Sequence, residues 1–306
     1  MAAQPVKITA TKQVPQNDSE KPYFMSTNKH VGRFLPALAA LVALGSGAIC
    51  AHADYASTVL ANGPIGYWRL NETTTAAAWD VAKNSGSLGS LAQGEYVPGA
   101  THPVPGIPGA GSDTAANFPN ANGGSGGVAR VRVPHIPELN SNAPFSIEFW
   151  ARPANLNDIA CPACSVDFNI TPRKGWLFYQ GNTGLNNANG WMFRAYRADA
   201  AVVRTAGVDL ALDPAQWYHL VGVYDGANVK LYVNGALAAS TPMEGPYAPT
   251  TPIIPLTFGS RADGASGNYG WGGDIDEAAY YGAALSDARI LAHYQAGSSL
   301  APTTPY

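Results

Sequence analysis

Charged residues are scarce in this chain: they make up 13% of its 306 residues, against about a quarter in an average soluble domain. The formal net charge is only −3, and no block of basic residues occurs. Electrostatic binding to nucleic acid needs a dense basic surface, so nothing in this composition supports that function. The apolar content of 46% is too high for a disordered chain, and the length suits one large domain or two small ones.

Cysteine is also rare, with three residues. Cys50 lies in a segment that we expect to be removed, which leaves Cys161 and Cys164 separated by Pro-Ala. This spacing occurs in redox motifs and, with a second pair, in zinc sites, but neither a second pair nor a βαβ pattern accompanies it. We therefore predict a disulfide between Cys161 and Cys164 that pins a surface loop in an oxidising compartment.

The apolar run at residues 34–49 is short for a membrane-spanning helix, which needs roughly 20 residues. Basic residues precede it, and Ala51-His52-Ala53 follows as a small-x-small motif. This order predicts a signal peptide at 25–53 that is cleaved after Ala53, with an uncleaved anchor as the alternative. Residues 1–24 are an extension or follow from an unused start. We expect a secreted, periplasmic or cell-surface protein without a membrane span in the mature chain.

Glycine and proline are abundant, with 33 and 24 residues. Many turn formers together with little charge indicate a loop-rich all-β fold. After residue 54, short β-rich runs alternate with turn signals at the spacing expected of a sandwich. The predicted strands are residues 65–70, 115–118, 128–133, 145–151, 176–179, 191–196, 218–224, 229–233, 236–240, 256–259 and 275–281.

Local signals support several of these elements. Ala129, Val131 and Val133 share one face of their strand and the two intervening arginines share the other, which is the period of a half-buried strand. Asn234-Gly235 predicts a two-residue hairpin, because both positions tolerate positive φ. One helix is expected at residues 287–296, where Ser286 is the N-cap and Gly297 ends the helix; residues 298–306 follow as a linker or tail.

Four sequence blocks and their order along the chain are informative: residues 66–72 (Gly-Tyr-Trp-Arg-Leu-Asn-Glu), 145–150 (Phe-Ser-Ile-Glu-Phe-Trp), 217–235 and 274–294. They resemble the bacterial laminin-G-like (concanavalin A-like lectin/glucanase) jelly-roll domains. The resemblance implies an all-β, two-sheet antiparallel jelly-roll sandwich with one short C-terminal helix, in a single domain over residues 54–297. It also implies that the first and last blocks pair.

Glucanases that resemble this chain use carboxylates on alternate positions of one strand, at i, i+2 and about i+4 or i+5. Here Asp274 and Asp276 share a face, but Glu277 faces the other way and position 278 is alanine. Glu148, on another strand, stands alone. We therefore predict no catalytic residue, and a glycoside hydrolase is the less favoured alternative.

The same resemblance implies a structural Ca²⁺, which relatives in this fold often hold at the acid that starts the closing strand. Asp276 matches that position, with Glu72 or Asn71 nearby. Carboxylate and carbonyl oxygens are the ligands that Ca²⁺ prefers. The alternative is a strand end capped by hydrogen-bonded acids.

Four aromatic residues lie in or beside Asn/Gly-rich stretches and are candidate ligand-binding residues: Trp191, Tyr196, Tyr269 and Trp271. Sugar faces stack on aromatic rings, although packing in the core is the alternative for each. We predict a non-catalytic carbohydrate-binding or adhesion module whose partner is a polysaccharide, another glycan or a cell-surface protein. Because no charge cluster is visible, binding should depend little on salt. The alternative is a structural unit of a larger surface protein.

Overall fold

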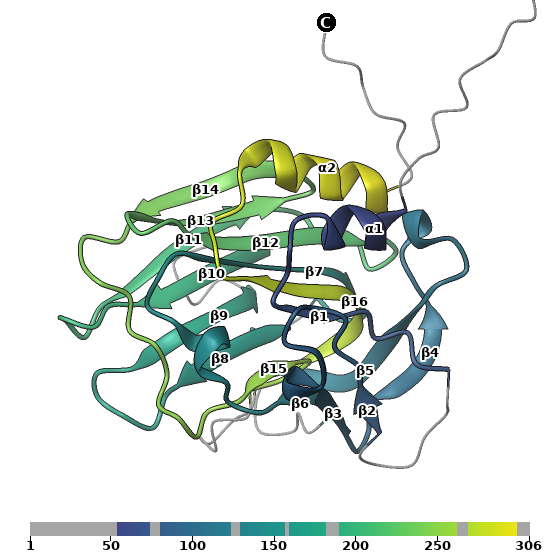
Figure 1. Ribbon diagram of the computed structural model, residues 1–306, viewed down its shortest axis with the longest axis horizontal. Helices are drawn as coiled ribbons and strands as arrows, with labels where there is room; N and C mark the ends of the chain where they lie inside the picture. Colours follow the sequence, from purple (N-terminus) through teal and green to yellow (C-terminus); the bar gives the residue numbers. More distant parts are fainter. Residues whose placement is uncertain are drawn as a thin grey trace, which may run out of the picture. The chain divides into compact units, whose positions relative to one another are not determined.

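The computed structural model describes residues 54–73, 80–123, 129–156, 159–181, 190–261 and 269–298. All of them fall within one compact unit, Cys50–Tyr306, and they form two antiparallel sheets packed face to face (Figure 1). The predicted signal peptide with its cleavage site, and all but the first residue of the predicted tail, lie outside the described residues. No helix in the described part of the chain is long and apolar enough to cross a bilayer.

Sheet A contains β1 (Gly66–Trp68), β4 (Thr101–Pro105), β5 (Thr114–Gly123), β7 (Phe145–Pro153), β12 (Tyr218–Tyr224), β13 (Asn228–Val233), β14 (Ala236–Pro242) and β16 (Gly270–Tyr281). The spatial order is β14-β13-β12-β7-β16-β5-β4, and β1 pairs with β16 off this path. Gly66 lies opposite Tyr280 and Trp68 opposite Ala278, so the predicted pairing of the first and last blocks is confirmed.

Sheet B contains β2 (Val81–Ala82), β3 (Gly94–Val97), β6 (Arg130–Val133), β8 (Ala163–Asp167), β9 (Lys174–Gln180), β10 (Gly190–Tyr196), β11 (Val203–Asp209) and β15 (Leu256–Phe258). The spatial order is β11-β10-β9-β8-β15-β6-β3-β2. With 8 strands in each sheet, the predicted all-β sandwich is confirmed.

The main core lies between the two sheets and follows from the two-residue period of the strands. On β7, Phe145, Ile147 and Phe149 enter this core, whereas Trp150 belongs to a separate cluster on the outer face of sheet A. Each large side chain that is fully buried in this way contributes about 1.5–3 kcal/mol.

Two helices lie side by side on the outer face of sheet A, α1 (Tyr55–Leu60) and α2 (Asp287–Gly297) (Figure 1). The predicted N-cap of α2 is confirmed, since Ser286 accepts a hydrogen bond from the backbone N–H of Arg289. Helix α1 was not predicted, because its six residues are too few to show a helical period. Asp54 caps it by accepting from the N–H of Ser57 at 2.7 Å. Three short 3₁₀ segments complete the described elements: η1 (Gly89–Ala92), η2 (Pro108–Ala110) and η3 (Pro137–Asn140).

Candidate ligand-binding site

The outer face of sheet B carries polar and aromatic side chains at alternate strand positions. On β10, Trp191 and Phe193 point into the main core, whereas Met192 and Tyr196 belong to a second apolar cluster on the outer face. Arg194 shares this outer face, and its guanidinium lies 5.5 Å from the ring centre of Tyr179. The face that sheet B turns away from the core therefore mixes cationic and aromatic groups.

The structure corrects the prediction for two of the four aromatic candidates. Trp191 and Trp271 have no exposed surface and lie in the main core. The indole N–H of Trp271 donates to Gln180 Oε1 at 2.7 Å, which satisfies its polar atom inside the protein. A ring without exposed surface cannot stack on a sugar, so both tryptophans are core residues, the alternative that the sequence left open.

The other two candidates, Tyr196 and Tyr269, lie on the outer face of sheet B. Tyr196 is 6% exposed and lines a cavity of about 390 Å³, together with Arg173 and Arg194. Tyr269 is partly buried, and the guanidinium of Arg261 lies 4.5 Å from its ring centre. Both remain predicted ligand-contacting residues, and the structure brings each of them next to an arginine.

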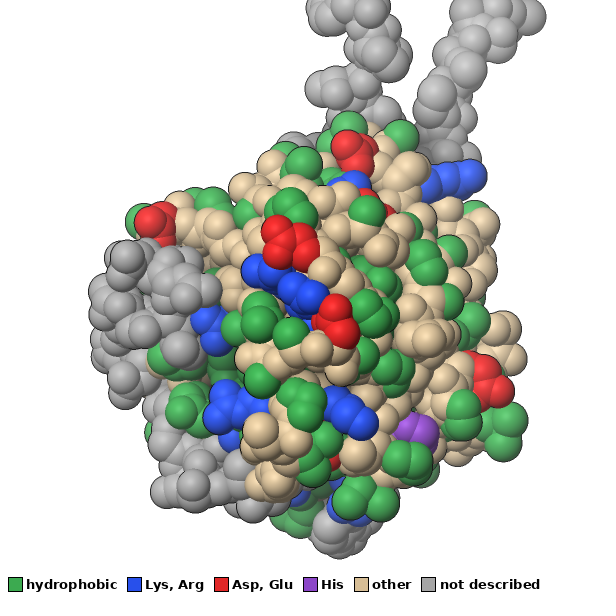
Figure 2. Space-filling view, turned by 90° about the vertical axis from the view of Figure 1, so that its left-hand side faces the viewer, with side chains coloured by type: hydrophobic (Ala, Val, Ile, Leu, Met, Phe, Trp, Pro, Cys, Tyr) green, Lys and Arg blue, Asp and Glu red, His purple; other side chains and the backbone are tan. Residues whose placement is uncertain are grey.

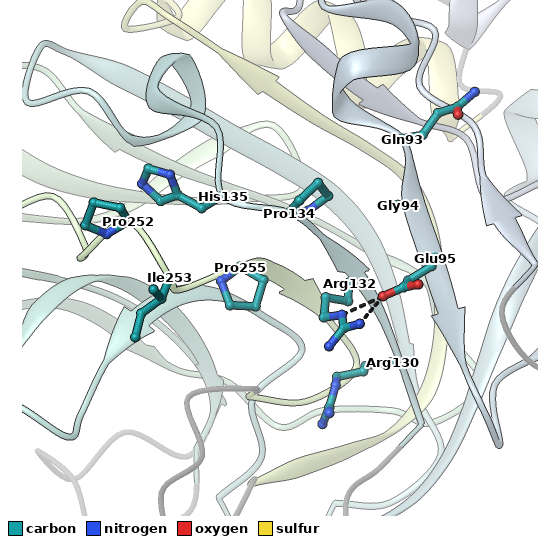
Figure 3. A pocket seen from close by; sticks show the side chains of 10 residues that line it. All are labelled: Gln93, Gly94, Glu95, Arg130, Arg132, Pro134, His135, Pro252, Ile253 and Pro255. Atoms are coloured by element: carbon teal, nitrogen blue, oxygen red, sulfur yellow. Dashed lines mark hydrogen bonds and ion pairs between the residues drawn. The ribbon is translucent and has the colours of Figure 1, made fainter.

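A second cavity, of about 710 Å³, opens on the same face beside β3, β6 and β15; we call it the β3/β6 cavity (Figure 3). Its rim combines three prolines and an isoleucine with a few polar groups, as is typical of ligand pockets of several hundred Å³. Ile253 is 85% exposed there. The lining residues are Gln93, Gly94, Glu95, Arg130, Arg132, Pro134, His135, Pro252, Ile253 and Pro255.

The two arginines of the β3/β6 cavity have different electrostatic partners (Figure 3). Arg132 lies opposite Glu95 across the strand pair, and its Nε donates to Glu95 Oε1 at 2.7 Å. Arg130 lies opposite Val97, and no acidic side chain among the described residues pairs with it. Burial, followed by the nearby charge of Arg132, lowers the pKa of Arg130. The cavity thus contains one neutralised and one uncompensated cation.

Further basic residues lie towards the β11 edge of sheet B. Figure 2 shows Lys and Arg side chains gathered on that side of the molecule, with acidic side chains beside only some of them. Arg197 pairs with Asp199 at 2.7 Å, and Arg204 pairs with Glu244. Arg173, in contrast, stacks over the ring of Phe168 at 4.4 Å. The sequence does not reveal this grouping, because these arginines come from separate segments.

The acidic residues of β16 do not line either cavity. Asp274 accepts from Arg152 Nη2 at 2.7 Å and is 8% exposed. Asp276 and Glu277 have no exposed surface. Burial raises the pKa of Asp276 well above its usual range and raises the pKa of Glu277 to about 7, although the charge of Arg69 opposes the second shift. These carboxyls are inaccessible to a ligand on the outer face of sheet B.

The predicted calcium ligands fit the structure only in part. Among the described residues, no three acidic, His or Cys side chains converge in an arrangement that holds a metal. Both oxygens of Glu72 accept hydrogen bonds, from the N–H of Lys83 at 2.8 Å and from the hydroxyl of Tyr96 at 2.7 Å, and Glu72 stays a predicted ligand. Asp276 Oδ2 accepts from the N–H of Ile107, whereas its buried Oδ1 lacks a hydrogen-bond partner. Calcium at Asp276 stays a prediction.

The predicted disulfide is not formed. Cys161 and Cys164 are buried thiols, not bonded to each other, within the apolar cluster on the outer face of sheet B. Strand β8 begins at Ala163, so the chain runs into an extended strand rather than closing a tight turn. The two thiols also have separate partners: Cys164 Sγ lies 3.2 Å from Thr257 Oγ1, and Cys161 Sγ donates to the carbonyl of Ala163 at 3.6 Å.

Comparison with known proteins places this fold in a family. A family model described as the concanavalin A-like lectin/glucanases superfamily matches residues 123–291, more than half of the chain. A search of curated proteins finds no matching sequence.

Solved structures with the same fold are distant in sequence. The binding domain of Paraclostridial Mosquitocidal Protein 1 is 14% identical with a TM-score of 0.54, and the match covers 77% of this chain and 52% of that one. The ligand-binding domain of botulinum neurotoxin serotype D, solved in complex with N-acetylneuraminic acid, is 12% identical with a TM-score of 0.52, covering 78% and 52%. The match spans about half the length of each of these two chains, and such identities show a common fold. By sequence and by architecture, the chain belongs to the concanavalin A-like lectin/glucanases superfamily.

Proposed function

We propose that this protein is a non-catalytic glycan-binding module and that its ligand occupies the β3/β6 cavity. The observation that carries the proposal is the make-up of this cavity, where an apolar rim of prolines and Ile253 surrounds Arg130 and Arg132. The C–H faces of a sugar ring bury well against such a rim, while its hydroxyl groups bond to the polar side chains. Cleavage of a glycosidic bond would need a pair of carboxyls flanking that bond, and Glu95 is the one carboxyl among the residues that line this cavity.

The fold of the sheets supports the same function. The botulinum neurotoxin domain named above was solved in complex with N-acetylneuraminic acid, and a sandwich of this architecture makes up about half of that chain. We further propose that the chain acts outside the cytoplasm, as a secreted, periplasmic or surface-displayed protein. A polysaccharide is the favoured partner and a cell-surface protein the other.

A glycan array and pull-down on insoluble polysaccharides test the proposal with the purified full chain. Ile253→Ser removes an exposed side chain from the rim of the cavity and should weaken binding about fivefold, since the lost apolar contact is worth roughly 1 kcal/mol. Leu237→Ser is the matched control: Leu237 is 49% exposed on β14 of sheet A, outside the cavity. The control should bind as the wild type does.

Two outcomes would contradict the proposal. If both variants lose affinity equally, the ligand does not occupy the β3/β6 cavity. If no polysaccharide binds while the protein melts normally, the structural unit of a larger surface protein becomes the better function.

A further inference from the structure

We infer that the ligand of the β3/β6 cavity is an acidic glycan, and that one of its carboxylate groups pairs with Arg130. This inference rests on the glycan-binding function proposed above and names the class of sugar. It reverses the expectation, drawn from the low overall charge, that binding should depend little on salt.

The register of the strands places Arg130 in the β3/β6 cavity without an acidic partner across the strand pair. Arg130 and Arg132 are two residues apart on β6, so both side chains project to the outer face while Val131 enters the core. Across the β3–β6 pair, Arg132 meets Glu95, whereas Arg130 meets the apolar Val97. Glu95 compensates the charge of Arg132, and the positive charge of Arg130 is left uncompensated.

The hydrogen bonds of Arg130 are also incomplete. Its Nη1 donates to the carbonyl of Arg261 at 3.3 Å, and its Nε is buried without a hydrogen-bond partner. A guanidinium that is half-buried with unused donors is costly, because burial removes water that would otherwise solvate the charge. A ligand that brings an anion to the accessible part of this guanidinium compensates its charge.

A carboxylate is the group that matches this guanidinium best. Its two oxygens lie in one plane and accept two parallel hydrogen bonds from the planar fork of an arginine. The hydroxyl groups of a neutral sugar bring acceptors without a charge, so they leave the positive charge of Arg130 uncompensated. Sulfate esters carry a negative charge as carboxylates do, so the experiment below compares the two groups.

Affinity electrophoresis of the full chain through gels containing defined polysaccharides tests the inference. The carboxylated probes are polygalacturonate and polysialic acid, the neutral match is methyl-esterified polygalacturonate, and dextran sulfate with dextran forms the sulfated pair. Wild-type protein should bind a carboxylated probe at least about tenfold more tightly than the ester, and 0.5 M salt should remove most of that difference.

The variants assign the effect to one side chain. Arg130→Gln should abolish the preference for the acid, because it should lower affinity for the acid by a larger factor than affinity for the ester, while Arg130→Lys, which keeps the charge but loses the planar fork, should retain part of the preference. Arg289→Gln makes the same charge change at an exposed position on α2 and should behave as the wild type does. The melting temperature of Arg130→Gln should stay equal or rise, because an uncompensated buried charge is removed.

The possible outcomes distinguish a failure of the acidic-glycan inference from a failure of the proposed glycan-binding function. Equal affinity for the acid and its ester, with no effect of Arg130→Gln, overturns the acidic class and leaves the glycan-binding function standing. A preference for dextran sulfate alone that depends on Arg130 overturns the carboxylate in favour of sulfate esters. No binding to any of these polymers or to the glycan array overturns the proposed function itself.

Discussion

At the scale of single residues, Glu148 joins sheet A to helix α2 through a buried polar cluster. Its carboxylate lies 2.9 Å from His293 Nδ1 and 3.1 Å from His219 Nε2, and it accepts from the hydroxyl of Tyr281 at 2.5 Å. Burial alone would raise the pKa of Glu148, but the charge of His293 and hydrogen bonds from both histidines hold it well below its usual range. With no exposed surface, Glu148 supports the fold rather than chemistry on a ligand.

Glu277 has the opposite kind of environment. It is buried between the hydroxyl of Tyr67 and the guanidinium of Arg69, and burial raises its pKa to about 7. An unfolded glutamate has a pKa of about 4.3. Between these two values the folded protein binds a proton that the unfolded chain releases, so this contribution to stability is complete below about pH 4.3 and lost as the pH rises through 7.

We therefore predict a pH-dependent effect of Glu277→Gln. The amide cannot ionise, so the stability of the variant relative to wild type should improve from pH 5 up to about pH 7 and level off by pH 8. Urea unfolding of both proteins across this range measures the difference. A constant difference would show that Glu277 keeps an ordinary pKa in the folded protein.

The sequence identifies some of these side chains and misses others for a physical reason. The alternation of Arg130 with Val131 is a local pattern and predicts correctly which of them faces outwards. Trp191 and Trp271 each follow a glycine. The structure shows that their strands begin at Gly190 and Gly270 and that both rings enter the core. The cluster of Glu148 with His219 and His293 depends on strand register and on the docking of α2, which no local pattern encodes.

At the scale of elements, regular alternation and turn chemistry predict the long strands well. Each predicted strand overlaps an observed one, and the Asn234-Gly235 turn has the positive φ values expected, 52° and 78°. Strands β2, β3, β4, β8 and β11 were not predicted. Of these, β2 has two residues and β11 is a half-exposed edge strand of mixed polarity, so neither carries a clear apolar period.

The hairpin turn also contacts helix α2, which gives it a second role. A Cβ atom on Gly235 would lie 2.9 Å from Tyr294 Cβ, whereas one on Gly63, at a similar φ of 63°, would meet nothing within 4 Å. Gly235→Ala should therefore destabilise by more than Gly63→Ala, about 2 kcal/mol against about 1 kcal/mol, since only the first adds a clash to the backbone strain.

Thermal or urea unfolding of the two alanine variants measures this contrast directly. Equal losses of stability would mean that α2 shifts away from the turn at no cost. The comparison isolates the helix contact, because both substitutions impose a left-handed conformation on a residue with a side chain.

At the scale of the whole molecule, the two outer faces of the sandwich differ. Helices α1 and α2 cover sheet A, whereas the outer face of sheet B carries the β3/β6 cavity, the cavity beside Tyr196, and Arg130 without an acidic partner. The family resemblance predicts the sandwich from the sequence, but the site itself escapes prediction. It forms where the Pro252–Pro255 segment passes beside β6, and residues more than a hundred positions apart meet there.

Export is the prediction that belongs to this scale. If the segment up to Ala53 is a signal peptide, the purified mature protein should begin at Asp54, which is the residue that caps α1. N-terminal sequencing of protein from the extracellular or periplasmic fraction checks this. Protein that remains in the cytoplasm with residues 1–50 attached would contradict it.

The packing of α1 against α2 brings the first and last described elements together. A Cβ atom on Gly297 would lie 2.9 Å from a ring atom of Tyr55, so the first and last described elements are adjacent, and they lie on the side opposite the β3/β6 cavity (Figure 1). Copies immobilised on a solid support through either end would therefore all turn their arginines towards the solution. A dense layer of such copies would engage a long polymer at many points at once, and weak individual contacts would then add up to high avidity.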